Sequence, residues 1–360
     1  MMFVLILLLM GIGTCIQGKE EFSWREKRML AEAPKLNAEN ILDGDFDSES
    51  ENWAADHLPG RDFLVGLYAK AERLWNLQVT KDIYVADDER LVERPEAYNE
   101  NVIQKNMTVF LEFAGKTELP VDLMLVPSAG CMMQKSIQGL ADPYEDERVV
   151  ETSYALCEGK LNTLNLIPLF SDSPENLYYR TDHHWTSRGA YCAFKAYMDM
   201  LGRSSPPESD YQIRKMDGFL GTTWSRACFW NVSAESLELW EKKDSYQVTF
   251  SDRKEADFLF FPEHLEEYDK YPVFLDGNHP LITIRNLSGS ADGKLLVIRD
   301  SFASCFSCFL AGEFETVTLV DLRYYRQPVS KLLQEEDYDR VLILYSVNHF
   351  LTDSNILWLE

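Results

Sequence analysis

The sequence predicts an α/β protein with a mostly parallel sheet flanked by helices. Four short apolar runs support this prediction, at 121–126, 295–298, 317–320 and 341–344. Runs that stay apolar without alternation are typical of strands covered on both faces, as in parallel sheets. The composition is that of a globular chain, because 46% of the 360 residues are hydrophobic and 26% are charged. Disorder, a collagen-like repeat and a pure coiled coil are therefore excluded.

The first 18 residues predict an export signal or an N-terminal anchor. Residues 3–16 are apolar or small, and the first charged residue is Lys19. A run of this length is too short for a comfortable membrane span and matches the apolar core of a secretory signal. Cys15 leaves a lipid-modified N-terminus open as an alternative. We therefore expect an exported protein at the cell surface, in the periplasm or outside the cell, either released or anchored by its N-terminus.

Two further segments follow this signal. Residues 19–85 are polar and acidic except for apolar residues at helical spacing between 62 and 77, and we expect this segment to pack on the core. Residues 86–360 contain the four predicted strands and form the α/β domain. Within that domain, residues 204–290 contain Pro-Pro, many aromatic residues and no regular spacing. This stretch predicts an inserted irregular or β-rich cap over one edge of the sheet.

The charge and the cysteines exclude several classes of partner and cofactor. The chain has 35 Lys and Arg against 59 Asp and Glu, a net charge of −24, which repels phosphate backbones and excludes nucleic acid as a partner. Apart from Cys15, six cysteines remain, which permits disulfides in an exported chain with about 15 connectivities. Cys305 and Cys308 form a close pair without the second pair that a zinc ribbon needs. We therefore expect neither a metal nor another cofactor.

The loop before a predicted helix contains the first candidate site residues. Thr186 or Ser187 can cap that helix, which places Asp182, His183 and His184 directly before its N-terminus. The positive end of a helix keeps a histidine neutral, as a general base requires. Side chains two apart in an extended loop share a side, so Asp182 can orient His184 while His183 points the other way. This alternation argues against a metal site with both histidines. A purely structural capping loop is the alternative.

The second and third candidates follow predicted strands. Ser301 lies where the strand at 295–298 turns into a helix, so its hydroxyl is exposed and is a candidate nucleophile. Alternatively, Asp300 or Ser301 only caps that helix. Asn348 follows the strand at 341–344 and can present its amide to a developing oxyanion, unless it is a turn residue. Trp185 and Arg299 are candidates for substrate contact, through sugar stacking and a local positive charge.

These motifs together resemble the bacterial DHHW protein family. The signature is Asp182-His183-His184-Trp185 with its flanks Tyr-Tyr-Arg-Thr and Thr-Ser-Arg-Gly-Ala-Tyr. Further segments extend the resemblance over nearly all of the chain after the signal, at 22–30, 56–62, 219–224, 300–302, 320–325 and 341–350. The family is similar to the SGNH-hydrolase-like acetyltransferases that include the alginate O-acetylation enzymes.

The resemblance implies an SGNH-hydrolase-like sheet and a Ser-His-Asp triad. Asp182 and His184 take the places of the family's acid and base, and Ser301 that of its nucleophile. The order Asp, His, Ser is reversed relative to ordinary SGNH esterases and fits the rearranged topology of the acetyltransferase branch. Arg299 and Asp300 depart from the small residues often found before the serine.

The resulting functional hypothesis is acyl transfer in the cell envelope. The chain would O-acetylate a cell-envelope or secreted polysaccharide, with acyl groups supplied by a membrane partner. A glycan or acetyl esterase differs only in the second acceptor, and a non-catalytic envelope module on a degenerate SGNH scaffold is the other alternative. The net charge favours a neutral or amino-sugar polymer over a polyuronate such as alginate. The sequence leaves the oligomeric state open.

Overall fold

The computed structural model describes residues 5, 10–14, 20–74, 79–80, 82–86, 88–137, 142–157, 159–171 and 177–359. Most of the predicted export signal, including Cys15, lies outside these residues. No helix within them has the length and apolar character needed to cross a membrane. No disulfide joins the six cysteines that the structure describes.

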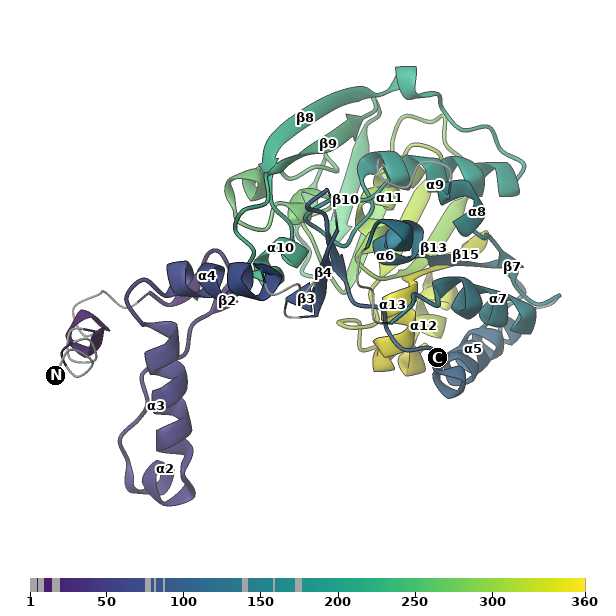
Figure 1. Ribbon diagram of the computed structural model, residues 1–360. Helices are drawn as coiled ribbons and strands as arrows, with labels where there is room; N and C mark the ends of the chain where they lie inside the picture. The colour runs from purple at the N-terminus through teal and green to yellow at the C-terminus, as the bar shows by residue number, and fades with distance from the viewer. Residues whose placement is uncertain are drawn as a thin grey trace.

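An eight-stranded sheet forms the centre of the molecule (Figure 1). The four strands predicted from apolar runs lie side by side in it and run parallel. They are β14 (Thr316–Val320), β13 (Lys294–Arg299), β15 (Arg340–Ser346) and β6 (Val121–Val126), in that spatial order. The short strand β7 (Asn162–Thr163) adds one more parallel pairing at the edge beside β6. The predicted α/β class is therefore confirmed.

The segment 204–290 extends the opposite edge of this sheet. Its strand β12 (Leu281–Asn286) pairs antiparallel with β14, and β10 (Tyr246–Phe250) and β11 (Glu255–Ala256) follow. A hairpin of β8 (Gln212–Phe219) and β9 (Glu235–Glu241) stands apart from the sheet (Figure 1). The sheet is mixed as a result, because the insertion supplies antiparallel strands as well as covering structure.

Alternating residues of the central strands face two separate cores, as the pleat requires. Leu295 and Val297 pack with α9 (Ser187–Met200) and α11 (Phe302–Leu310) on one face. Leu296 and Ile298 pack on the other face with four further helices. These are α5 (Glu100–Gly115), α7 (Asp146–Leu156), α12 (Val329–Glu335) and α13 (Val347–Thr352). Short helices and 3-10 turns complete the domain: α6 (Ala129–Met133), α8 (Ile167–Phe170), α10 (Thr222–Ala227), Gln134–Ser136, Glu208–Asp210, Pro262–Glu266, Tyr271–Val273 and Ser354–Trp358.

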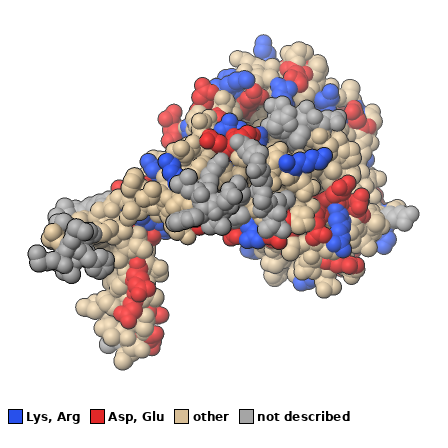
Figure 2. Space-filling view, viewed as in Figure 1, with Lys and Arg blue, Asp and Glu red and all other residues tan. Residues whose placement is uncertain are grey.

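The N-terminal segment forms an arm beside the α/β domain (Figure 1). It contains β1 (Phe22–Ser23), β2 (Arg28–Met29), α2 (Ala38–Asp43), α3 (Asp45–Asp56) and α4 (Arg61–Leu74). Helix α3 has no buried residue, and its acidic side chains are visible along the arm in Figure 2. A small sheet of β3 (Val79–Thr80), β4 (Ile83–Val85) and β5 (Leu91–Glu93) follows, and β4 is fully buried.

The amphipathic helix expected between 62 and 77 forms as α4, but Phe63 and Leu67, two of its large apolar residues, remain exposed. Phe63 and Leu67 are 71% and 51% exposed. The helix packs instead through small residues, since the Trp230 indole occupies the space that a Cβ at Gly66 would need and Ala69 is buried. The periodicity therefore located the helix but not its buried face.

Candidate active site

Asp182, His184 and Ser301 form one continuous chain of hydrogen bonds. His184 Nδ1 lies 2.5 Å from Asp182 Oδ1, and His184 Nε2 lies 2.8 Å from Ser301 Oγ. With the imidazole proton on Nδ1, His184 donates to the carboxylate and accepts from the serine hydroxyl. Asp182 and His184 are buried, whereas Ser301 is partly exposed. The structure thus brings together the three residues that the sequence proposes as a triad, although Ser301 lies 117 positions after His184.

The backbone around His184 is held by short-range bonds. The Thr186 hydroxyl oxygen accepts from the Gly189 amide at 3.1 Å and caps α9, one of the two capping residues expected. Thr186 N donates to Leu177 O, and Tyr179 N donates to His184 O, so the loop closes on itself before the helix starts. Helix α9 therefore begins immediately after the candidate base.

Glu235, a residue of β9, fixes the start of the same loop. Its carboxylate accepts from the backbone amides of Arg180 and Thr181 and from the Thr181 hydroxyl, at 2.6–2.9 Å. Burial raises the pKa of Glu235, although the bonds from Thr181 and Arg180 oppose that rise. From the other side, the Arg90 guanidinium donates to the carbonyls of Tyr178 and Tyr179.

Both carboxylate oxygens of Asp182 accept hydrogen bonds. Its Oδ1 also accepts from the His184 amide at 2.9 Å, and its Oδ2 accepts from the backbone and the hydroxyl of Thr222. Burial alone would raise the pKa of Asp182, but His184, His183 and these hydrogen bonds hold it well below the usual value. A Cβ at Gly221 would overlap the Asp182 side chain, so only glycine lets α10 approach this closely. Asp182 is therefore an ionised carboxylate in a tightly fitted position.

His184 is held in its neutral form. Burial lowers the pKa of His184, and the neighbouring His183 lowers it further, against the opposing effect of Asp182. The sequence predicts the neutral state from the helix N-terminus, and here burial is the larger cause. A neutral imidazole with a free lone pair on Nε2 can accept the Ser301 proton.

The prediction that His183 points away from His184 is wrong. The two rings lie 3.9 Å apart, and His183 Nδ1 is 3.1 Å from the Thr222 hydroxyl oxygen. Residues 180–184 form bends rather than extended chain, so the alternation expected of a strand does not apply. Asp182, His183 and His184 each have a possible ligand atom within 4.8 Å of the others. The argument that the two histidines point apart therefore cannot be used against a metal site. However, Asp182 and His184 Nδ1 already satisfy each other, and a cation there would have to break these bonds.

Ser301 does not serve as a side-chain cap for α11. Asp300 does so instead, since its Oδ1 accepts from Phe302 N at 2.9 Å and its Oδ2 accepts from Ser346 N at 2.7 Å. This division leaves the Ser301 hydroxyl for His184. The alternative in which Ser301 merely caps the helix is therefore excluded by the geometry.

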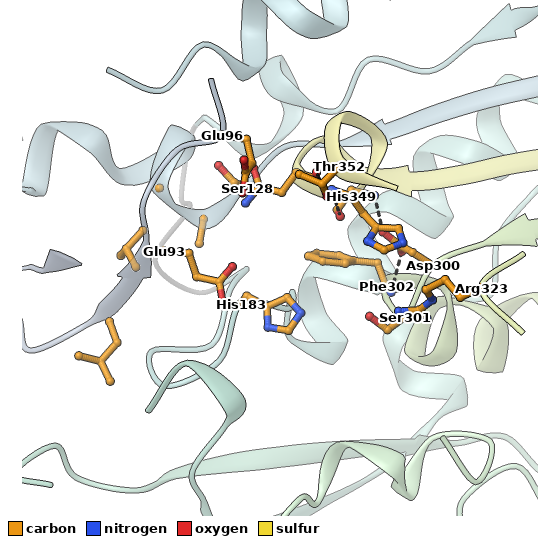
Figure 3. Close-up of a pocket in the computed structure, with 16 residues that line it drawn as sticks. Glu93, Glu96, Ser128, His183, Asp300, Ser301, Phe302, Arg323, His349 and Thr352 are labelled. Atoms are coloured by element: carbon orange, nitrogen blue, oxygen red, sulfur yellow. Dashed lines mark hydrogen bonds between the residues drawn. The ribbon is translucent and has the colours of Figure 1, made fainter. Parts of the chain in front are cut away.

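A cavity of about 220 Å³ opens beside the Ser301 hydroxyl (Figure 3). One wall carries Ser301, Arg323 and His349, and the facing wall carries Glu93, Glu96 and Ser128. His183 also lines this space, with its side chain 32% exposed. The cavity is small and polar, with carboxylates opposite an arginine.

Of the three predicted contact residues, only Asn348 reaches the cavity. Trp185 is 0% exposed, and its indole N–H donates to Phe302 O at 3.0 Å, so it is a core residue. Arg299 is 1% exposed and donates to Ser304 Oγ at 2.9 Å beneath the cavity wall. Both predictions of substrate contact are therefore corrected. The arginine at the cavity is Arg323, which Asp321 holds through two nitrogens at 2.8 and 2.6 Å.

Sequence reasoning missed most of the residues that support the triad. Gly221 and Thr222 lie in the segment 219–224, which the sequence connects to the site only through the family resemblance. Arg323 likewise lies in the segment 320–325. Glu235 comes from the insertion, and no local signal connects it to the loop at 182–184.

Comparison with known proteins identifies relatives of this chain. Residues 157–320 match the family described as DHHW protein, which confirms the expected resemblance. A DHHW family protein from Eubacterium siraeum has a similar structure, with a TM-score of 0.66, 18% identity, and coverage of 78% of this chain and 95% of that chain. No match was found among curated protein sequences.

Two further solved structures are similar. PatB1 from Bacillus cereus, in a structure described as carrying a sulfonyl adduct, has a TM-score of 0.66 and 19% identity, covering 77% of this chain and 98% of that chain. The O-acetyltransferase domain of AlgJ from Pseudomonas putida has a TM-score of 0.45 and 11% identity, covering 76% of this chain and 93% of that chain. The likeness to the DHHW family protein and to PatB1 establishes a shared fold, and that to AlgJ is too low to carry an argument.

Proposed function

We propose that this chain, whose residues 157–320 match the DHHW protein family, is an exported acyl-transfer enzyme that O-acetylates a polysaccharide. The observation that carries the proposal is the unbroken hydrogen-bond chain from Asp182 through His184 to Ser301. A serine hydroxyl bonded to a neutral imidazole, with a buried carboxylate on the far nitrogen, is the arrangement that activates a serine nucleophile.

The proposed reaction has two halves. Ser301 Oγ attacks the carbonyl carbon of an acyl donor while His184 Nε2 takes the hydroxyl proton. The tetrahedral intermediate collapses, the donor's leaving oxygen receives that proton, and the acyl group remains as an ester on Ser301. In the second half, His184 takes the proton of an acceptor hydroxyl, which attacks this ester and restores Ser301. Asp182 stays ionised throughout and stabilises the imidazolium formed in each half.

Two donors are available for the oxyanion of the intermediate. The Ser301 backbone N–H and the Asn348 side-chain amide have no hydrogen-bond partner among the described residues. Asn348 lines the same cavity as Ser301. Donors that point at the developing charge without prior partners are the arrangement expected of an oxyanion hole.

The acceptor in this proposal is a neutral or amino-sugar polymer. The net charge of −24 opposes the approach of a polyanion, and Glu93 and Glu96 add carboxylates at the cavity itself. Export, and a membrane partner that supplies acyl groups, are parts of the same proposal. An acetyl esterase would use the same first half, with water as the second acceptor.

The test is covalent labelling together with turnover. We expect a sulfonyl fluoride or a serine-directed phosphonate to label the purified protein, with peptide mapping placing the label on Ser301. The Ser301→Ala variant should lose labelling and hydrolysis of a chromogenic acetate ester while keeping its circular dichroism spectrum. Labelling that persists in Ser301→Ala, or maps to Ser304, would contradict the proposal. Adding neutral oligosaccharides to the ester assay separates transfer from hydrolysis, because transfer yields an acetylated sugar.

A further inference from the structure

The imidazole of His184 lies against a tyrosine from the insertion. The ring of Tyr271 is 3.9 Å from it, centroid to centroid, with only 9° between the planes. Tyr271 begins the 3-10 turn Tyr271–Val273 and is 7% exposed. It comes from a part of the chain 87 positions after His184. The insertion therefore contacts the candidate base directly.

The contact completes the enclosure of the His184 ring. The His183 ring also lies 3.9 Å from it, centroid to centroid, and the two nitrogens of His184 are bonded to Asp182 and Ser301. The imidazole thus has aromatic neighbours, and both of its nitrogens have partners. The Phe302 ring also lies 4.9 Å from the imidazole but is tilted by 49°, so the loss of Tyr271 would remove a parallel ring from the imidazole and let it tilt away from Ser301.

The ring of Tyr271, rather than its hydroxyl, makes this contact. The hydroxyl is buried and has no hydrogen-bond partner among the residues that the structure describes. Burial raises the pKa of Tyr271 well above its usual value, so the phenol stays neutral. A neutral aromatic face is electron-rich and attracts a cation placed over it.

Tyr271 is itself held in place. The Asp269 carboxylate accepts from the Tyr271 amide at 3.4 Å and also pairs with Lys27 at 3.4 Å. The same Lys27 ammonium donates to Leu220 O at 3.2 Å, next to the Gly221 that packs on Asp182. The arm thus connects two loops of the insertion, one against Asp182 and the other against His184.

We infer that Tyr271 is a positioning residue for the proposed acyl transfer, holding the His184 imidazole in the plane that serves Ser301 and stabilising the imidazolium by its aromatic face. The inference rests on the proposed function. It assigns to the insertion a part in orienting the candidate base, in addition to its structural role.

Three variants test this inference. Tyr271→Phe keeps the aromatic face, and Tyr271→Leu removes it. The matched control is Tyr211→Leu. Tyr211 is another buried tyrosine of the insertion whose hydroxyl has no partner within the described part of the chain, but it packs on Trp240 and Tyr191. The measurements are the melting temperature, kcat and KM for an acetate ester, and the rate of sulfonyl labelling.

We expect Tyr271→Phe to retain kcat within about twofold, because its face is unchanged. Tyr271→Leu should lower kcat and the labelling rate roughly 10- to 30-fold, as expected for a desolvated cation–π contact, with little change in KM. Tyr211→Leu should lower the melting temperature without that loss of kcat. A folded Tyr271→Leu with full kcat would overturn the inference, and so would an equal loss in Tyr271→Phe.

Failure of the proposed function is recognised separately. If Ser301→Ala remains as active as the unmodified protein, the proposed function fails whatever Tyr271 does. If the unmodified protein shows no turnover, the imidazole nitrogen NMR spectrum still decides the positioning role. The Nε2 resonance of His184, which reports its hydrogen bond with Ser301, should be the same in the unmodified protein and in Tyr271→Phe and should shift toward that of an unbonded imidazole nitrogen in Tyr271→Leu. An unchanged Nε2 resonance in all three would overturn the inference.

Discussion

The Thr222 hydroxyl donates to the outer oxygen of Asp182 at 2.9 Å, and the Thr222 backbone amide donates to the same oxygen at 2.7 Å. The inner oxygen is left to His184. The first turn of α10 therefore fixes the rotation of the Asp182 carboxylate, and through it the orientation of the imidazole. The residues that determine this arrangement lie outside the triad.

The Gly221→Ala substitution should damage the site through Asp182. A Cβ there overlaps the Asp182 side chain, so either the carboxylate or α10 must shift. We expect a loss of about 1–3 kcal/mol in unfolding free energy, as for other overpacked positions, and a fall in kcat of roughly 100-fold because small misplacements are costly. Chemical denaturation measures the unfolding free energy, and ester kinetics measure kcat. The control is Gly115→Ala in α5, where the added Cβ meets no atom within 4 Å and stability should not fall. Unchanged activity in Gly221→Ala would disprove the constraint.

The Glu235→Gln substitution should loosen the loop before His184. Oε1 of Glu235 accepts from all three donors, and Oε2 accepts from the Arg180 amide as well. In a glutamine an NH2 group replaces one of these oxygens and faces an N–H donor, at a cost of about 1–3 kcal/mol. We expect a lower melting temperature together with a lower kcat. Glu241→Gln on the same strand removes only a half-exposed pair with Arg214 and should change stability by less than about 1 kcal/mol. Equal effects from the two variants would contradict the assigned role.

The His183→Gln substitution should shift the pH profile. Activity requires neutral His184, so kcat/KM falls as the pH drops through the pKa of His184. His183 helps to lower that pKa, and its removal should raise the pKa and move the acidic limb of the profile toward higher pH. His184→Ala should instead abolish activity at every pH. A profile for His183→Gln that is unchanged, or moved toward lower pH, would show that His183 has no such influence.

The Asn348→Ala substitution tests the proposed oxyanion donor. Loss of one such donor lowers kcat by about 100- to 1,000-fold elsewhere, with a smaller effect on KM. We expect a fall in that range with an unchanged melting temperature, because the amide has no partner among the described residues. Asn355→Ala provides the control, because Asn355 does not line the cavity and bonds Asp353 and Arg326 instead. This variant should lower the melting temperature without the large fall in kcat. A fall in kcat below about threefold would leave the Ser301 amide as the main donor.

The acceptor can be tested by the salt dependence of binding. We expect neutral and amino-sugar oligosaccharides to bind in preference to polyuronates. The preference should be clearest at low salt, because the Debye length is about 30 Å at 0.01 M and the repulsion is then weakly screened. Isothermal calorimetry at low and high salt makes the comparison. Tight polyuronate binding that weakens with salt would show that Arg323 at the cavity outweighs the net charge of −24.

The sequence predicts those features of this protein that depend on local patterns. The four central strands are mostly apolar because both of their faces are buried, with Asp122 and Thr318 as polar exceptions, and Thr186 is a recognisable cap. The grouping of Asp182, His184 and Ser301 follows from their places at a helix start and a strand end. The resemblance to a family strengthened each of these predictions.

Features that depend on tertiary packing could not be predicted in this way. The position of Arg299, two residues before Ser301, predicts contact with the substrate, but Arg299 is the last residue of β13, is buried and donates to Ser304. The position of His183 depends on the bends at residues 180–184, which no local sequence pattern predicts. Glu235 and Tyr271 act across long separations, where spacing carries no information.

The bridge made by Lys27 has a consequence for the order in which the chain can assemble. Its partners lie 193 and 242 positions later, at Leu220 and Asp269. Because contacts between such distant segments form slowly and require both segments to be present, an incomplete chain that ends before Asp269 cannot make this bridge. Within the described residues, Lys27 can thus connect the loops beside Asp182 and His184 only when the chain extends at least to Asp269. A chain that has lost Lys27 by N-terminal clipping is therefore expected to fold its central sheet, whose strands all follow residue 120, but to leave the loops beside Asp182 and His184 unconnected.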